Sequence, residues 1–344
     1  MRRSRTGMAH RRTPPPRRRP ATFRRAVCVL AAVVIMTLAP ASTSVPPELW
    51  TTPGAAPGVS VAPGEGPAPD DDVVVPTRVP EAVAATFPTR SSVGLPAGWE
   101  PKDEHTGDLW IRARGAVVED LRITGGVIRV AAENVTLRRV QAVDAFVVND
   151  VNGACGSGLV VESSTFTRTA GATETDLPVI GTGGFTVRDV LIDGVPEGIR
   201  VGSKHCGGVT VENSYIAVVP PAECQDWHGD GIQGHNGGPV LVRQSVITLE
   251  ERADCPGNAP FFYPGDQDNT SLTIDGLLVS GGGYPFRAGT SGTVYNLRVV
   301  DESWGYGPAE VSCPAVAVTG SHLVTVAANG RTTPVGRLAP CGGA

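Results

Sequence analysis

The chain has 344 residues with 29 basic and 34 acidic side chains, and these charges are unevenly distributed along it. Residues 1–41 contain ten arginines and no acid, so residues 42–344 carry 19 basic and 34 acidic residues, a net charge of −15. Such an acidic protein is not expected to bind nucleic acid or an anionic membrane surface non-specifically.

The first 41 residues are predicted to be an export signal. Their arginines precede an apolar run, AVCVLAAVVIMTL (26–38), which is followed by Ala39-Pro40-Ala41. A basic region, a short apolar region and a small-residue site are typical of a secretory signal peptide. The apolar run is shorter than the roughly 20 residues that span a bilayer. We therefore expect a secreted, extracellular protein that has no membrane association after signal removal; an uncleaved anchor is the alternative.

Residues 42–79 are rich in Pro, Gly, Ala, Ser and Thr, with an acidic cluster at residues 70–72. This composition offers too little apolar surface to offset the entropy lost on ordering, so we predict a disordered linker. The folded domain is expected to span residues 80–344. Residues 80–108 are predicted to cover its first coil, with Phe87 and Trp99 as apolar contacts.

A weak repeat begins near residue 109, in which Gly or Asn introduces a short run of alternating apolar residues. The positions taken as equivalent are Leu137, Val161, Val187, Val211, Val242, Ile274 and Tyr295, separated by 24, 26, 24, 31, 32 and 21 residues. Each unit reads as two short strands with a bend between them, and no helical periodicity follows the signal. The pattern predicts an all-β, right-handed parallel β-helix in one domain. A β-sandwich is the second choice, and the gaps are too short for propeller blades.

Six cysteines remain once the predicted signal, which contains Cys28, is removed. An even number in an exported chain favours disulfides, and fifteen pairings of six cysteines are possible. We expect neighbours along the chain to pair, as Cys155–Cys206, Cys224–Cys255 and Cys313–Cys341. No C-x-x-C or H-x-x-x-H spacing occurs, so no structural metal site is predicted.

The densest group of chemically useful residues is QDWHGDGIQGHN (225–236). Asp226, His228 and Asp230 are two residues apart, so an extended segment would place them on one face. Aligning the segments at residues 197–200, 230–233 and 284–287 puts Ile199, Ile232 and Phe286 in an inward row. Further polar and aromatic residues are then predicted on the outward side near His228: Glu197, Arg200, Gln233, Tyr263, Tyr284 and Arg287.

These side chains suit sugar chemistry. Carboxylates and amides bind hydroxyl groups, aromatic faces stack on sugar rings, and arginine pairs with a uronate carboxylate. We assign catalytic roles to His228 as acid or base, Asp230 as its partner, and Arg200 as the group that stabilises a developing enolate. The remaining residues, including Asp226, are assigned to substrate binding. Turn formation by the Asp-Gly and Asn-Gly pairs is the alternative explanation.

Several parts of the sequence resemble a known family. GLPAGWEP (94–101), the coils that follow it, and HGDGIQ (228–233) resemble the phrases G-V-P-A-G and H-x-D-G-I-Q of secreted bacterial proteins with the pectin-lyase-like right-handed β-helix fold. The resemblance covers roughly residues 94–300 and implies action on polysaccharides. The chain has Ile216-Ala217-Val218 where the family often has Ile-His-Asp, and it lacks the polygalacturonase acid set. Calcium binding is kept as an alternative, because Asp266 and Asp268 would supply only some of the ligands of a calcium site.

The function expected from these features is that of an extracellular, monomeric, carbohydrate-active protein with a polysaccharide as its partner. A polysaccharide lyase is the first reading and a glycoside hydrolase, which needs paired carboxylates, is the second. A non-catalytic carbohydrate-binding or cell-surface β-helix is the alternative. No organic cofactor is expected.

Overall fold

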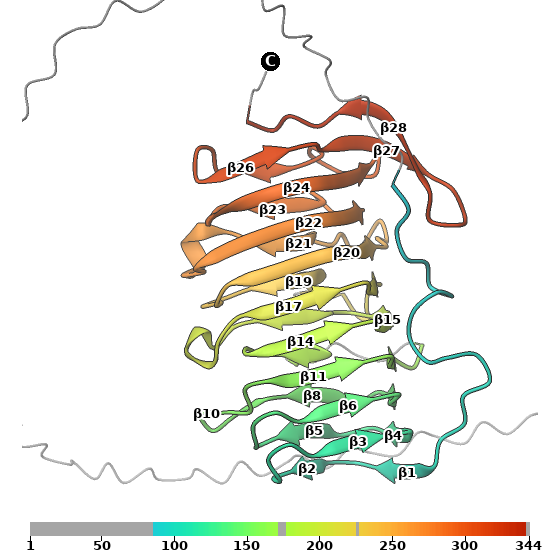
Figure 1. Ribbon diagram of the computed structural model, residues 1–344. Helices are drawn as coiled ribbons and strands as arrows, with labels where there is room; N and C mark the ends of the chain where they lie inside the picture. The colour runs from blue at the N-terminus through green and yellow to red at the C-terminus, as the bar shows by residue number, and fades with distance from the viewer. Residues whose placement is uncertain (1–84, 171–176, 225–226, 342–344) are drawn as a thin grey trace, which may run out of the picture. The chain divides into compact units, whose positions relative to one another are not determined.

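The computed structural model describes residues 85–170, 177–224 and 227–341. The predicted signal and linker lie outside the described residues. The described chain forms a parallel β-helix, in which each coil contributes strands that pair with equivalent strands of the coils before and after it (Figure 1). The alternative of a β-sandwich is wrong, because successive coils pair in parallel and not as antiparallel hairpins.

One face of the β-helix is a nine-stranded parallel sheet. Its strands, in stacking order, are β2 (Leu109–Ile111), β5 (Val127–Val130), β8 (Phe146–Val148), β13 (Ile180–Gly181), β16 (Ile199–Val201), β19 (Asp230–Gly234), β21 (Ala259–Tyr263), β23 (Phe286–Ala288) and β25 (Glu310–Val311). These strands have two to five residues each, so each coil exposes only one or two outward residues on this face.

The remaining wall is a seventeen-stranded sheet that each coil crosses as two short strands or one long bent strand. Its strands are β1 (Asp103–Thr106), β3 (Val117–Glu119), β4 (Leu121–Thr124), β6 (Thr136–Arg138), β7 (Gln141–Val143), β11 (Leu159–Glu162), β12 (Thr165–Thr167), β14 (Phe185–Arg188), β15 (Leu191–Val195), β17 (Val209–Glu212), β18 (Tyr215–Val218), β20 (Val240–Leu249), β22 (Ser271–Ser280), β24 (Ser291–Val300), β26 (Val316–Thr319), β27 (His322–Val326) and β28 (Thr332–Arg337).

Three smaller features complete the described fold. Strands β9 (Asp150–Val151) and β10 (Ala154–Cys155) form an antiparallel pair. Two short 3₁₀ helices, η1 (Lys204–Cys206) and η2 (Gly265–Gln267), lie in connections between coils. Strand β28 pairs antiparallel with β27 and ends the stack.

The bend within the larger sheet recurs at equivalent positions of successive coils. Asp189, Asn213 and Gln244 occupy it with φ of 54°, 42° and 41°, and Gly276 follows with φ of 87°. Asp and Asn tolerate this left-handed conformation better than most side chains. Ser214 and Ser245, which come directly after the bend, are buried, and each hydroxyl donates a hydrogen bond to the carbonyl two residues before it. The two-strand reading of each repeat is therefore confirmed.

The apolar row predicted from the repeat forms the core of the larger sheet. The equivalent positions are in register and at most 1% exposed: Leu137, Val161, Val187, Val211, Val242 and Ile274. The last predicted member is wrong by one residue. Val294 pairs with Ile274, whereas Tyr295 points outward and is 58% exposed, because strand alternation sends adjacent residues to opposite faces.

All three predicted disulfides are present: Cys155–Cys206, Cys224–Cys255 and Cys313–Cys341. Cys224–Cys255 joins two successive coils, whereas Cys155–Cys206 joins β10 to η1 across the intervening coil that contains β13. The Cα atoms of the three pairs are 5.3, 5.4 and 5.7 Å apart, within the normal range for a disulfide.

Residues 85–102, here called the strap, run along the outside of the larger sheet from its last coils to its first (Figure 1). At one end Phe87 donates its N–H to Gly330 and packs on Val246, Leu278 and Val324. At the other end Trp99 donates its indole N–H to Asp120. The prediction that both residues contact the first coil is thus correct for Trp99 and wrong for Phe87, which lies near the opposite end of the stack.

Candidate functional site

The inward and outward rows predicted on the nine-stranded sheet are confirmed. Inward, Ile199 pairs with Ile232, then Phe261, then Phe286, and all four are fully buried. Outward, the same registers align Arg200, Gln233, Phe262 and Arg287. Residues up to 87 positions apart in sequence therefore stack at successive strand spacings of about 4.8 Å.

A groove of about 590 Å³ lies over the last coils of this outward face. Its aromatic members are Trp227, Phe262, Tyr284 and Tyr306, and its polar side chains are His228, Gln233, Asn258, Gln267 and Arg287. Tyr306 is 82% exposed, and its ring centroid lies 5.7 Å from that of Tyr284. We refer to this set of residues as the groove.

His228 and Asp230 do not share a face, contrary to the expectation from their spacing. His228 is exposed and lines the groove, whereas Asp230 is 1% exposed and does not line it. The reason is Gly229, whose φ of 56° interrupts the extended alternation. A Cβ at Gly229 would lie 2.6 Å from the Trp227 ring, so glycine is also required for this contact.

The Asp230 carboxyl group lies behind the groove wall. Its Oδ1 accepts hydrogen bonds from Asn258 Nδ2 at 2.9 Å and from the Ala259 N–H at 3.3 Å, while Oδ2 is buried without a partner. Burial, together with the nearby Glu197 carboxylate, raises the pKa of Asp230 well above its usual value. No hydrogen bond joins its carboxyl group to His228 among the described residues, so the predicted orienting role is not supported by a contact.

Asn258 was not identified from the sequence, and it connects three parts of the site. Besides donating to Asp230, it accepts from Arg287 Nη1 at 3.1 Å and donates its backbone N–H to the His228 carbonyl at 2.6 Å. A single asparagine in the connection before β21 thus holds three coils together. Only its position directly before the aligned apolar run APFFY offered a signal in the sequence.

The predicted arginines already have carboxylate partners. Arg200 Nη2 contacts both Glu197 oxygens, at 2.7 and 2.8 Å, and its Nε also donates to Gln233 at 3.2 Å. Arg287 pairs with Glu310 at 2.5 Å and lies over the Phe262 ring at 4.9 Å. Arg200 is thus held by Glu197 and is absent from the groove lining, so Arg287 is the arginine placed to meet a ligand.

The prediction of Tyr263 as a substrate-binding residue is wrong. Its side chain is fully buried in the core, and its hydroxyl donates to the Gly238 carbonyl. In β21 the outward position belongs to Phe262, and strand alternation sends Tyr263 inward. Burial raises the pKa of the Tyr263 phenol, which keeps it in the neutral form that donates this hydrogen bond.

Three further aspartates were singled out from the sequence, and the structure describes two of them. Asp226 lies outside the described residues. Asp268 pairs with Lys204 Nζ at 2.6 Å, so an ammonium group already supplies the charge that calcium would bring. Asp266 lies in a separate hollow that it shares with Arg287 and Glu310. The two aspartates are therefore not set around a common cation in the described part of the chain.

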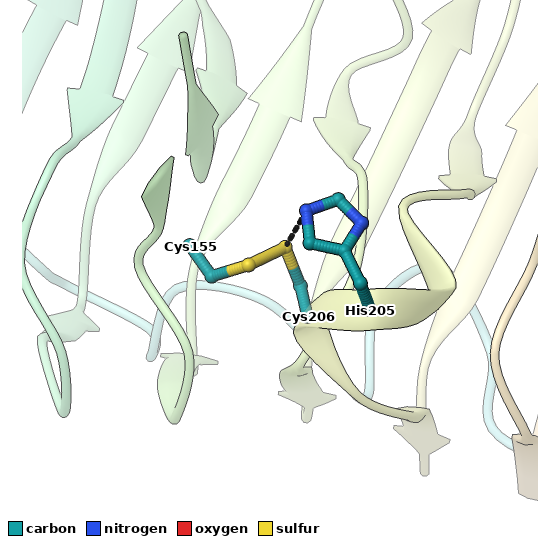
Figure 2. Close-up of side chains that lie close together, drawn as sticks. All are labelled: Cys155, His205 and Cys206. Carbon is teal, nitrogen blue, oxygen red and sulfur yellow. Dashed lines mark hydrogen bonds between the residues drawn. A yellow bond between two sulfur atoms is a disulfide. The ribbon is translucent and has the colours of Figure 1, made fainter. Parts of the chain in front are cut away.

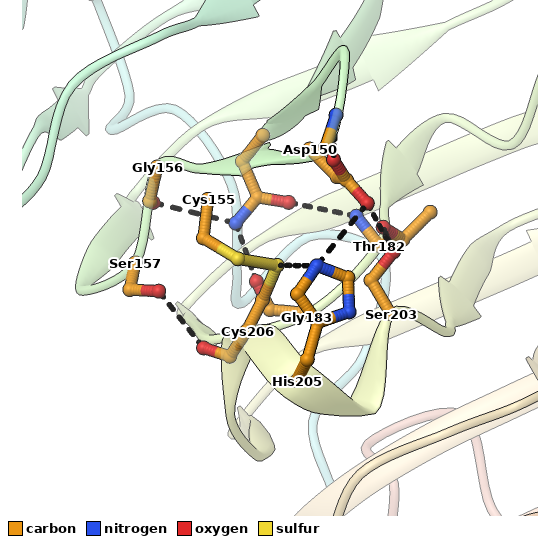
Figure 3. Close-up of a disulfide and its surroundings, with 11 residues drawn as sticks. Asp150, Cys155, Gly156, Ser157, Thr182, Gly183, Ser203, His205 and Cys206 are labelled. Atoms are coloured by element: carbon orange, nitrogen blue, oxygen red, sulfur yellow. Dashed lines mark hydrogen bonds and ion pairs between the residues drawn. A yellow bond between two sulfur atoms is a disulfide. The ribbon is translucent and has the colours of Figure 1, made fainter. Parts of the chain in front are cut away.

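A cluster of metal-binding residue types occurs at Cys155, His205 and Cys206, whose ligand atoms lie within 4.8 Å of one another (Figure 2). The two cysteines form a disulfide, and a bonded sulfur offers no thiolate to a metal. The surrounding hydrogen bonds hold this corner in place, among them Ser157 Oγ to the Cys206 carbonyl at 2.8 Å (Figure 3). We therefore assign the cluster a structural role.

The buried carboxyl group leads to a prediction about stability and pH. The raised pKa means that folded Asp230 binds its proton more tightly than the unfolded chain does. The free energy of unfolding should therefore fall as pH rises from the unfolded pKa through the folded one. Asp230→Asn removes this ionisation and is expected to raise stability at pH 8 by about 1–2 kcal/mol.

Urea unfolding of wild type and Asp230→Asn at pH 5 and pH 8 measures this effect. Asp275→Asn, which changes an exposed acid on the larger sheet, serves as the matched control and should leave the pH difference unchanged. A loss of stability of equal size at both pH values in Asp230→Asn would contradict this prediction, because the carboxyl group would then stabilise the fold without any dependence on its ionisation.

Comparison of the chain with protein-family models, with curated proteins and with solved structures gives no match. Within residues 85–170, 177–224 and 227–341, no helix has the length and apolar character needed to cross a membrane. Three disulfides indicate that the chain folds in an oxidising compartment.

Proposed function

We propose that this is an extracellular, carbohydrate-active β-helix protein whose groove binds a polysaccharide chain. The observation that carries the proposal is the composition of the groove, where Tyr284 and Tyr306 stand beside His228, Gln233 and Arg287. Aromatic faces bind the apolar faces of sugar rings, and amide, imidazole and guanidinium groups bind their hydroxyls. This combination of a few polar groups with aromatic walls is typical of small-molecule and sugar sites.

The position of the strap supports the choice of face. It crosses the larger sheet, where Arg90 pairs with Asp193 at 3.2 Å and with Glu250 at 3.3 Å. Phe87 covers Val246 and Leu278 on the same side. Part of the outward surface of the larger sheet is therefore already occupied by the chain itself. The groove lies on the other wall, over the nine-stranded sheet, and its rim carries the exposed Tyr306.

The two tyrosines give the direct test. Tyr306→Ala and Tyr284→Ala are each expected to weaken polysaccharide binding about tenfold, because each removes an aromatic surface without disturbing the core. Binding is measured by affinity electrophoresis and calorimetry on a panel of soluble polysaccharides. Tyr295→Ala, an equally large change at a 58% exposed position on the larger sheet, is the control and should bind as wild type does.

Two results would contradict the proposal. One is that wild type retains none of the polysaccharides on the panel. The other is that all three tyrosine variants bind a retained polysaccharide equally well, because binding would then occur away from the groove.

Catalysis by β-elimination on a uronate chain is the second candidate. His228 is exposed in the same groove as Arg287, which suits proton abstraction beside a carboxylate held by a guanidinium. In that step the imidazole takes the proton next to the uronate carboxyl group, a carbon–carbon double bond forms, and the glycosidic oxygen leaves. Hydrolysis by paired carboxylates is less supported, since Asp230 is buried and Glu197 is bound to Arg200.

Turnover can be separated from binding in the same incubations. Ultraviolet absorbance of unsaturated uronates reports elimination, whereas new reducing ends without that absorbance report hydrolysis. Retention of a polysaccharide without either product identifies a non-catalytic binding protein. The resemblance to pectin-lyase-like β-helix proteins, which rests on HGDGIQ and GLPAGWEP, also favours a protein that acts on polysaccharides.

A further inference from the structure

The outward row of the groove continues along the nine-stranded sheet to the first coils. Parallel registers align Trp110 with Arg129 and Arg129 with Val148, and then Val148 with Gly181. Ile180 pairs with Ile199, which places Gly181 next to Arg200, the first residue of the row described above. One outward row therefore runs from Trp110 to Arg287 and on to Glu310.

The row contains the same arrangement of side chains twice. Arg129 lies over the Trp110 ring at 5.4 Å, and Arg287 lies over the Phe262 ring at 4.9 Å. In both cases the aromatic residue belongs to one coil and the arginine to the next. Each arginine is also held by an acid at 2.5 Å, Asp108 in the first case and Glu310 in the second.

The first copy is more exposed and more basic than the second. Trp110 is 40% exposed, whereas Phe262 is 8% exposed. A second guanidinium, that of Arg112, lies 4.3 Å from the Trp110 ring centroid. No ion pair with an acid is found for the exposed Arg112 in the part of the chain that the structure describes. This end of the row therefore presents an aromatic ring together with a cation that is not neutralised by a neighbour.

The row between the two copies holds Val148, Gly181, Arg200 and Gln233. Val148 and Gly181 occupy the row between Arg129 and Arg200. A Cβ at Gly181 would lie 3.0 Å from the Pro178 ring, so a larger side chain would be crowded there. Trp110 and Phe262 are six strand spacings apart, which is about 29 Å. A linear polymer lying across the strands would reach from one aromatic position to the other by passing over the residues that cover Gly181.

We propose that Trp110, Arg112 and Arg129 form a second contact point for the polysaccharide, and that this point takes an anionic sugar unit. The inference rests on the proposed function of the groove and extends it, because it fixes the direction of the bound chain along the stack of coils. The guanidinium groups supply charge-assisted hydrogen bonds to a carboxylate or sulfate, and the Trp110 indole supplies apolar contact.

Chain length tests the second contact point separately from the groove. Size-fractionated oligouronates shorter and longer than the 29 Å spacing are titrated into wild type, Trp110→Ala and Arg112→Gln, with size-matched neutral glucans alongside. We expect Trp110→Ala to weaken binding of the long oligouronates about tenfold and to leave the short ones unchanged. Arg112→Gln is expected to weaken only long oligouronates, not neutral glucans.

The test has one control variant and three outcomes that would count against the inference. Tyr295→Ala, on the larger sheet, should change none of these affinities, and thermal unfolding confirms that Trp110→Ala is folded. Short fragments that bind wild type, with long fragments indifferent to Trp110→Ala, would overturn the second contact point and leave the groove standing. Equal losses on short and long fragments would overturn it as well. Failure of oligouronates of every length to bind wild type would refute this inference, and the proposed function would be refuted with it only if the neutral glucans also failed to bind.

Discussion

Replacing Phe286 by alanine is expected to lower the free energy of unfolding by about 3–5 kcal/mol, because it removes a fully buried ring from a close-packed core. The Phe286 ring stacks on that of Phe261 in the preceding coil, with centroids 4.9 Å apart and planes 8° apart. The truncation therefore loses both apolar burial and an aromatic contact. Urea unfolding followed by far-ultraviolet circular dichroism measures the change.

Tyr284, two residues earlier, provides the matched control. It lies in the groove and is only partly buried, so Tyr284→Ala should change stability by about 0.5 kcal/mol or less while weakening ligand binding. Phe286→Ala should show the opposite pattern, with lower stability and unchanged binding per folded molecule. A stability loss in Tyr284→Ala as large as that in Phe286→Ala would contradict the assignment of inward and outward positions on this segment.

Removing the Cys224–Cys255 disulfide by double substitution to serine is expected to cost about 3–4 kcal/mol and to weaken binding in the groove. The cost follows from the chain entropy released when a loop of this length opens in the unfolded state. The loss of binding follows from position, because Trp227 and His228 come directly after this constraint and Asn258 follows its other end. Calorimetric unfolding and ligand titration measure the two effects.

The Cys313–Cys341 disulfide separates the two effects. Its sequence separation of 28 is close to the 31 of Cys224–Cys255, so the entropic cost of removing it is expected to be similar. Neither Cys313 nor Cys341 lines the groove, so the serine variant should keep its ligand affinity. Similar affinity losses in both variants would mean that the bridges affect binding through general stability alone.

The repeat could be predicted from the sequence because an inward row in a β-helix must be apolar in every coil. Leu137, Val161 and Val187 show this, since each recurs after 24 to 26 residues and each is buried where expected. The disulfides were predicted by pairing neighbours along the chain, and this rule held even for Cys155–Cys206, which spans an intervening coil. Where the coil length changes, the alignment becomes less certain, and Tyr295 was placed one residue away from Val294, the true member of the row.

The site was predicted less completely than the fold. Strand alternation correctly placed Gln233 and Arg287 in one outward row with Arg200. It failed for Asp230, because the left-handed conformation of Gly229 cannot be inferred from residue spacing. It failed for Tyr263 because aromatic residues are equally compatible with an inward and an outward position, and only the register with Phe286 and Arg287 decides between them.

The sequence by itself determined which residues alternate and where coils bend, because these depend on the local pattern within each recurring unit. The tertiary structure alone decided which residues meet across coils. Asn258 joins Asp230 and Arg287, and Trp110 and Phe262 come to occupy one outward row. The strap also reaches Gly330 from Phe87, a contact between residues 243 apart. Such contacts depend on how every strand between the two residues is aligned with the next one. No short segment of the chain contains that information.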